Sequence, residues 1–291
     1  MESPQGITRV VLVVLDGLRA DSAPLFPLPN LHALARRGAA TFEATTVQPS
    51  ITASAMTSLF TGVSPWIHGI QSDRFALPRP RQPLTFLPRL LRDHDRPVHA
   101  FIHDIPRAYR GLAARMAEHL GVTLSLHGQT AAEILDGALP QLQSPDGGVT
   151  FLHWPDADRA GHAHGWTSRE YAGAARDLDA SLGRLIAVLD PFDDPGTVVV
   201  AFADHGGGGR ETHNHESRHP LDVTIPIVIA GGQVVTGELA PMSSLLDIPA
   251  TIAWLFGIAQ PANYAGRPFV EAFAMERSPA PQVALEASRA A

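Results

Sequence analysis

Short, nearly uninterrupted apolar runs alternate along this chain with stretches of helical periodicity, and few folds accommodate that alternation. The runs span residues 10–15, 98–103, 149–154, 197–203 and 225–230. A strand that is apolar on both faces must be covered on both faces, as in the parallel sheet of an α/β domain. We therefore predict an α/β fold, a three-layer sandwich in which helices flank a mostly parallel central sheet.

The segments between the runs have the spacing of amphipathic helices. They span residues 31–37, 53–60, 84–93, 108–120, 131–139 and 168–189. The Pro- and Gly-rich breaks at 77–83, 144–148 and 190–196 are too short to separate domains. We predict one domain over residues 1–277 with at most a small cap near residues 71–82. The Ala-, Pro- and Ser-rich tail, 278–291, is predicted to be disordered.

Charge and residue usage exclude several classes of function. The net charge of -7 has no basic stripe to offset it, which argues against a nucleic-acid polymer as partner. All 22 basic residues are arginine, so a catalytic lysine and a P-loop are excluded. The absence of cysteine excludes disulfides, thiolate catalysis and Cys-ligated zinc.

The apolar run at residues 10–15 is the only N-terminal segment that could be mistaken for a targeting signal. It is short, has no basic segment before it, and continues directly into Asp16. It therefore has the character of a buried strand instead of a signal peptide or a membrane span. We expect no membrane insertion and a cytoplasmic location.

Acidic residues follow three of the predicted strands. They are Asp16, Asp158 and Asp204, and His162 and His205 lie beside the last two. A single loop aspartate usually makes an Asx-turn or caps a helix. Three at the carboxyl ends of parallel strands, next to histidines, indicate one shared site, because open α/β sheets build their sites at that edge.

Several motifs occur in a characteristic order. They are Asp16-Gly-Leu-Arg, Pro49-Ser-Ile-Thr52, Thr61-Gly62, Trp66-Ile-His68-Gly69, Asp158-Arg-Ala-Gly-His162, Ala-Asp204-His205-Gly, Ile225-Pro226 and Ser244-Leu-Leu-Asp247. This order resembles the alkaline phosphatase superfamily, specifically its type I phosphodiesterase/nucleotide pyrophosphatase branch. The resemblance covers most of the chain and implies an alkaline phosphatase-like core.

The resemblance implies two metal sites. Asp16, Asp204 and His205 would hold one divalent ion, with Thr52 coordinating it through its hydroxyl. Asp158, His162 and a later histidine would hold the other. Mixed carboxylate and imidazole ligands suit Zn²⁺ best and Mn²⁺ as an alternative. Two ions about 4 Å apart can clamp the attacking and leaving oxygens of an in-line displacement.

Thr52 is the expected nucleophile, and the implied path passes through a phosphothreonine that water then hydrolyses. It precedes Thr61-Gly62 by nine residues, as the nucleophile of the resembled family does, and it lies at a predicted helix N-terminus, which favours phosphate. The same stretch holds other hydroxyls that could instead cap or brace a helix. These are Ser50, Ser54, Thr57, Ser58 and Thr61.

Three histidines compete to be the last ligand of the second metal site. The spacing to Ile225-Pro226 is most similar to the family if His215 is the ligand, with His213 as the alternative and His219 as a surface or supporting residue. His68 is predicted to brace the turn after the nucleophile helix. His164 is predicted to face solvent.

Departures from the family affect the predicted substrate. Related nucleotide pyrophosphatases have Thr-Phe-Pro-Asn where this chain has Thr-Ala-Ser-Ala at residues 52–55. Arg19, the amide after Thr52 or the metals are candidates to replace the missing Asn as transition-state stabiliser. Sulfatases need a Cys or Ser nucleophile and an Arg four positions later, whereas this chain has Thr52 and Met56. Sulfatase activity is therefore disfavoured.

The predicted activity is metal-dependent hydrolysis of a small-molecule phosphoester, either a diester or a monoester. The alternatives are a metal-dependent phosphomutase or isomerase on the same core and a non-catalytic metal-binding relative. Nothing in the sequence indicates the oligomeric state.

Overall fold

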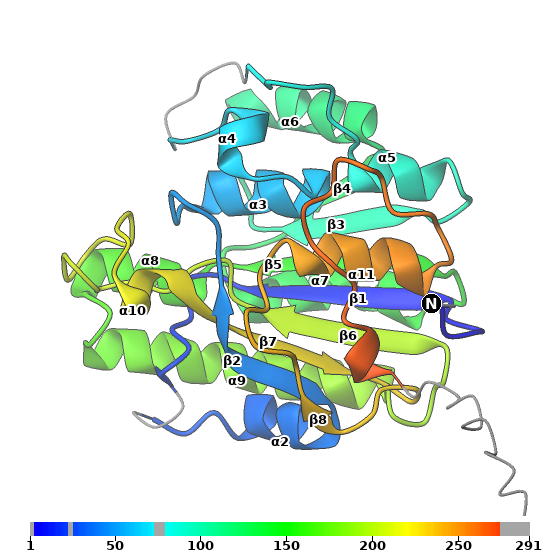
Figure 1. Cartoon of the computed structure of the whole chain (residues 1–291). Helices are drawn as coiled ribbons and strands as arrows, with labels where there is room; N and C mark the ends of the chain where they lie inside the picture. The colour runs from blue at the N-terminus through cyan, green and yellow to red at the C-terminus, as the bar shows by residue number, and fades with distance from the viewer. Residues whose placement is uncertain (1–2, 23–25, 73–78, 274–291) are drawn as a thin grey trace, which may run out of the picture.

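The computed structural model describes residues 3–22, 26–72 and 79–273, and it contains one twisted sheet between two layers of helices (Figure 1). Eight strands are found within these residues. They are β1 (Arg9–Leu15), β2 (Ala39–Thr45), β3 (Val98–Ile102), β4 (Val122–Leu126), β5 (Gly148–Trp154), β6 (Thr197–Phe202), β7 (Thr224–Ala230) and β8 (Gly237–Glu238). Their order across the sheet is β4-β3-β5-β1-β6-β7-β2-β8.

β1 is the centre of the sheet. It pairs in parallel with β5 on one side, where Leu15 lies opposite Trp154, and with β6 on the other. Its six residues from Val10 to Leu15 are at most 2% exposed, as the apolar run predicts. β7 is antiparallel to both of its neighbours, β6 and β2. The prediction of an α/β fold with a mostly parallel sheet is confirmed, with β7 as the reversed strand.

Helices cover both faces of the sheet. They are α2 (Pro29–Arg37), α3 (Thr52–Thr61), α4 (Pro65–His68), α5 (Leu87–Arg92), α6 (Arg107–Leu120), α7 (Ala131–Gln143), α8 (Asp156–His164), α9 (Arg169–Leu189), α10 (Pro220–Val223) and α11 (Asp247–Leu255). The long helix α9 contacts α2, α7 and α8 on one face, whereas α3, α5 and α11 contact one another on the other (Figure 1). None of the described helices combines the length and apolar character that crossing a bilayer requires.

The five predicted strands are all present, but several elements were not predicted. β2 and β4 are only partly buried, so neither has a continuous apolar run. α8 is polar along most of its length and lacks the apolar stripe that marks a helix in sequence. α11 is apolar nearly all round and contains Pro249 in its first turn, where proline is tolerated. Residues 73–78 of the predicted cap and the tail 278–291 lie outside the described residues.

Candidate active site

The strand order brings the three predicted aspartates together. β5, β1 and β6 are neighbours, so the segments that follow them meet at one edge of the sheet. The Asp16 N–H donates to the Trp154 carbonyl at 3.1 Å, and the Asp158 N–H donates to the Asp16 carbonyl at 3.0 Å. The Gly17 N–H donates to Asp204 Oδ1 at 3.3 Å. Backbone contacts therefore fix the relative positions of all three carboxylates.

Gly17 makes this close approach possible. Its φ of +70° lies in the left-handed region, and a Cβ at this position would lie 2.7 Å from the Asp158 Cα. Both constraints require glycine, because any side chain would push the segment after β5 away from the segment after β1.

Asp16, Asp204 and His205 form one group of potential metal ligands, the buried ligand group. One ligand atom from each lies within 4.8 Å of the others, and all three residues are at most 4% exposed. His205 Nε2 is 3.4 Å from Asp16 Oδ1 and 3.6 Å from Asp204 Oδ2. The group stands at the ends of two adjacent central strands, β1 and β6, in the buried centre of the sheet.

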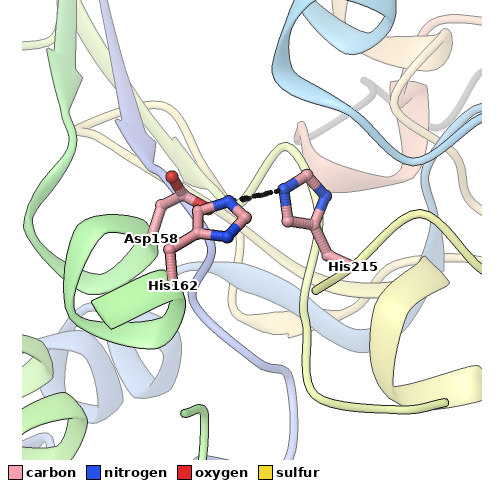
Figure 2. A group of neighbouring side chains, drawn as sticks. All are labelled: Asp158, His162 and His215. Carbon is pink, nitrogen blue, oxygen red and sulfur yellow. Dashed lines mark hydrogen bonds and ion pairs between the residues drawn. The ribbon is translucent and has the colours of Figure 1, made fainter. Parts of the chain in front are cut away.

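Asp158, His162 and His215 form a second group, the open ligand group (Figure 2). Asp158 and His162 are four residues apart on α8 and so share one face of the helix. His215 reaches the same point from the loop before α10, and its Nε2 is 3.1 Å from that of His162. Asp158 Oδ1 lies 3.5 Å from His162 Nε2 and 3.7 Å from His215 Nε2. The His162 side chain is 46% exposed, so this group opens to solvent.

A backbone carbonyl fixes the tautomer of each of these histidines. Each Nδ1 faces a carbonyl oxygen, which can only accept, so each Nδ1 carries the proton and each Nε2 presents a lone pair. The contacts are His162 Nδ1 with the carbonyl of His213 at 2.9 Å, His215 Nδ1 with that of Ser50 at 2.6 Å and His205 Nδ1 with that of Gly206 at 2.8 Å. The Nε2 lone pairs of His162 and His215 therefore face each other across 3.1 Å, which is unfavourable unless a cation lies between them.

The carboxylates of the two ligand groups also lack a positively charged partner. Asp16 Oδ1, Asp158 Oδ1 and Asp204 Oδ2 are buried and accept no hydrogen bond from the described part of the chain. Burial, with Asp204 and Asp158 close by, raises the pKa of Asp16 well above its usual value. Buried, unsatisfied carboxylate oxygens facing imidazole lone pairs suit Zn²⁺ or Mn²⁺. The residues present therefore fit one divalent ion in each group.

Thr52 is the first residue of α3, and its Oγ1 lies 3.2 Å from His205 Nε2. Because that nitrogen carries no proton, the threonine hydroxyl donates and its oxygen lone pairs stay available. The N-cap residue Ile51 provides no side-chain cap and the first turn has no acidic residue. The first amides of α3 are therefore free to bind an anion beside the hydroxyl.

The competing hydroxyls of this stretch are occupied by structural hydrogen bonds. Their partners are the Ile70 carbonyl for Ser54, the Ala53 carbonyl for Thr57, His68 for Ser58, the Thr57 carbonyl for Thr61 and the His215 carbonyl for Ser50. Thr52 is thus the hydroxyl of the stretch that faces the ligand groups.

The remaining histidines have other positions. His213 belongs to neither ligand group, is exposed, and orients His162 through its carbonyl. The His219 ring accepts from the Leu221 N–H at the start of α10. His68 is buried beside Ser58, and burial lowers its pKa to about 4. The structure thus brings His215, not His213, to the predicted second metal site.

Two residues beside the ligand groups were not predicted. Trp166 is fully buried, its Nε1–H donates to the Gly17 carbonyl at 2.9 Å, and its ring contacts both histidines of the open ligand group edge-on. His153, on β5, places Nε2 3.2 Å from Asp16 Oδ2, and burial lowers its pKa to about 4. A histidine inside an otherwise apolar strand was the signal available in the sequence; Trp166 had none.

Arg19, one candidate stabiliser of the transition state, pairs with a neighbour. Its Nε and Nη2 donate to the two carboxylate oxygens of Asp21 at 2.7 and 2.6 Å. The amides at the start of α3 remain the better candidate. A cleft of about 670 Å³ is lined by residues of the 210–222 segment, including Asn214 and Glu216.

The fold, with its two ligand groups and a hydroxyl at a helix start, defines an α/β protein of the alkaline phosphatase superfamily. The family model for type I phosphodiesterase/nucleotide pyrophosphatase matches residues 10–135 and 113–218. The chain belongs to that family.

Curated relatives include enzymes of two kinds. A phosphopentomutase of Shewanella frigidimarina is 28% identical over 52% of this chain and 35% of its own length. A bis(5'-adenosyl)-triphosphatase of Xenopus laevis is 24% identical over 68% of this chain and 47% of its own length. The chain thus spans a third to a half of the length of these relatives. Among solved structures, murine ectonucleotide pyrophosphatase/phosphodiesterase 5, an inactive variant in complex with AMP, superposes with a TM-score of 0.69 at 12% identity. That match covers 87% of this chain and 96% of the murine chain, and it shows a shared fold.

Proposed function

We propose that this protein hydrolyses a small-molecule phosphoester, with Thr52 as nucleophile and one divalent ion in each ligand group. The family membership supports phosphoester hydrolysis in general. The observation that carries the finer proposal is the orientation of His162, His205 and His215, whose lone pairs face carboxylates that lack partners. Zn²⁺ suits this donor set best, with Mn²⁺ as the alternative.

The residues of the chain have separable roles in the proposed reaction. Bound divalent ions would supply positive charge that stabilises the phosphoryl group and lowers the pKa of the threonine hydroxyl. Thr52 Oγ1 attacks phosphorus, the bond from phosphorus to the leaving oxygen breaks, and the threonine proton is released. The amides at the start of α3 bind a nonbridging oxygen. Water then attacks the phosphothreonine, releases the phosphate product and restores the hydroxyl.

Hydrolysis of two chromogenic substrates tests the proposal directly. Bis-p-nitrophenyl phosphate and p-nitrophenyl phosphate are compared with the protein loaded in turn with zinc and manganese. We expect hydrolysis of at least one substrate that stops on chelation and returns on adding metal. A faster diester rate defines a phosphodiesterase and a faster monoester rate defines a phosphatase. Activity on neither substrate, in a protein that holds two ions, would contradict the proposal.

Thr52→Ala is predicted to lower kcat by about 10³-fold or more, because no other hydroxyl of residues 50–61 faces the ligand groups. Metal content and thermal stability should stay close to wild type. Thr57→Ala is the matched control on the same helix, since its hydroxyl bonds only the Ala53 carbonyl, and it should retain turnover. Equal turnover in wild type and Thr52→Ala would exclude Thr52 as the nucleophile.

The phosphopentomutase relatives favour a second candidate, a metal-dependent phosphomutase on the same core. The two are separated by incubating the protein with a pentose phosphate. Free phosphate identifies a hydrolase, whereas an isomeric pentose phosphate identifies a mutase.

A non-catalytic metal-binding relative would hold both ions and release neither product. Sulfatase activity stays disfavoured because Thr52 and Met56 stand where sulfatases need a modifiable residue and an arginine. A cytoplasmic location and a single domain over residues 1–277 remain part of the proposal.

A further inference from the structure

A second cleft, of about 560 Å³, opens at the carboxyl end of β3 and is rich in positive charge. Arg107, Arg110 and Arg159 line it together with His103 and a single acid, Asp104. Three arginines against one aspartate leave two positive charges, in a chain whose net charge is -7. Such a local excess of positive charge attracts anions.

Hydrogen bonds hold the walls of this cleft in place. Arg159 Nη1 donates to the Gln129 carbonyl at 2.6 Å, and Gln129 Nε2 donates to the Asp104 carbonyl at 3.0 Å. Arg110 pairs with the Asp104 carboxylate, which therefore neutralises one of the three arginines. Within the described residues, Arg107 makes no hydrogen bond or ion pair and remains free to contact a ligand.

The start of α6 adds donors to the cleft, and His103 is a further lining residue. α6 begins at Arg107, and its N-cap Pro106 provides no side-chain cap, while the first turn holds no acidic residue. The first amides of this 14-residue helix and the positive end of its dipole thus meet the arginines. His103 Nδ1 is a buried atom that has no hydrogen-bond partner among the described residues.

The cleft lies along the same sheet edge as the ligand groups. The His103 ring lies 6.2 Å, centre to centre, from that of His153, whose Nε2 is 3.2 Å from Asp16 Oδ2. Arg159 directly follows Asp158 in sequence. β3 is separated from β1 by β5 alone, and two strand spacings correspond to about 10 Å.

We propose that this cleft is a second anion subsite of the active site, and that the substrate is a phosphoester carrying a second phosphate group. The spacing places that group about 10 Å from the reacting phosphorus. The inference rests on the proposed function for the position of the first phosphate. The subsite would select substrates that carry two phosphate groups, which the two ligand groups alone would not do.

Calorimetric titration of the zinc-loaded Thr52→Ala variant tests the subsite, because this variant should retain its metal and its fold without hydrolysing either ligand. Hexanediol bisphosphate, whose extended chain can reach both positions, is compared with hexyl phosphate. We expect the bisphosphate to bind at least about tenfold more tightly, the effect of a charge-assisted contact. When Arg107→Gln and Arg110→Gln are added to this variant, the advantage should fall to about twofold or less. Arg115→Gln is the matched control, since Arg115 is an exposed residue of the same helix outside the cleft.

Each outcome bears on one proposal. Equal affinity of the Thr52→Ala protein for the two ligands would overturn the subsite. An equal loss when Arg115→Gln is added instead would overturn it as well, because it would indicate a general charge effect. Preference for the bisphosphate, when the wild type hydrolyses no phosphoester, would leave the subsite supported and contradict the proposed hydrolysis. Hydrolysis of phosphoesters without a preference for the bisphosphate would support the proposed hydrolysis and contradict the subsite.

Discussion

The two ligand groups have the same chemistry, carboxylate with imidazole, but they are supported in different ways. Asp16 and Asp204 in the buried ligand group follow adjacent central strands and are at most 4% exposed. In the open ligand group, Asp158 and His162 stand on the short helix α8 and His215 on a loop, and the His162 side chain is 46% exposed. One ligand group is thus part of the sheet, and the other is assembled on its surface.

From this difference we expect the two proposed ion sites to have different roles. A rigid, water-excluded group holds its ligands in a fixed position and strengthens every charge interaction within it. An exposed group on a helix and a loop can gain and lose ligands, as the steps that admit water and release product require. We therefore expect the buried ion to be held tightly and the open one to exchange.

Replacing one ligand in each group should give the largest difference between the two groups, in metal retention and in kcat/KM. In Asp204→Asn the amide oxygen can still accept from the Gly17 and His205 N–H groups, as Asp204 Oδ1 does, while the second carboxylate oxygen is lost. We expect this variant to lose the buried ion and about 10³-fold in kcat/KM. His162→Gln should retain the buried ion, weaken only the open site, and lose about 10- to 100-fold.

Metal content after dialysis, measured by plasma mass spectrometry, gives the number of ions per chain. Asp156→Asn is the control, because Asp156 is near Asp158 but belongs to neither group and accepts from the Ala131 N–H. It should retain both ions. Loss of both ions from His162→Gln, with one retained in Asp204→Asn, would reverse the assigned order of affinity.

Metal removal should change the pH dependence of stability, chiefly through the buried ligand group. Burial and the neighbouring carboxylates of Asp204 and Asp158 raise the folded pKa of Asp16. In the metal-free protein, protonated Asp16 therefore contributes to the free energy of unfolding. This contribution is fully present below the pKa of Asp16 in the unfolded chain and is lost as the pH rises through its pKa in the folded protein. Bound ions compensate the charge, so the gain in Tm on loading should be larger at pH 8 than at pH 5.5, by a few degrees.

Thermal unfolding of the zinc-loaded and metal-free forms measures this gain. His215 does not contribute to the difference above pH 5, because burial lowers its pKa to about 4 and it stays neutral in both forms. Metal-free Asp204→Asn should show a weaker dependence, since one of the repelling charges is removed. A gain in Tm that is the same at both pH values would contradict this account of Asp16.

The sequence was sufficient for five strands of the sheet and for the convergence of acids at its edge. Continuous apolar runs identify β1, β5 and β6, because a strand buried on both faces needs them. The neighbouring positions of these strands, the reversal of β7 and the polar helix α8 could not be read locally. The order of the strands and the reversal of β7 depend on pairing between segments far apart in the chain. Helix α8 has potential metal ligands on one face and therefore lacks the apolar stripe by which a helix is predicted.

The seven predicted site residues lie together in the structure, and their roles as nucleophile and metal ligands remain predictions. Spacing alone left His213 and His215 as alternatives. The choice depends on a contact over 165 residues, from His215 Nδ1 to the Ser50 carbonyl. Trp166 could not be predicted from the sequence. Its place beside the ligand groups depends on Gly161 and Gly207, which pack against its ring in the folded chain.

Trp166 joins the two groups, and its substitution should give the smallest effect. It contacts His162 and His215 edge-on and donates to the carbonyl of Gly17, beside Asp16. Trp166→Phe should retain an aromatic ring but lose the hydrogen bond, which contributes about 1 kcal/mol. We expect a loss of roughly two- to fivefold in kcat/KM, within that energy, and faster zinc release from the open site alone, measured with a chromogenic chelator. Trp66→Phe, at an exposed position, should change neither quantity. Faster release of both ions would show that Trp166 supports the sheet edge as a whole, and the separation between a fixed and an exchanging site would then have to be abandoned.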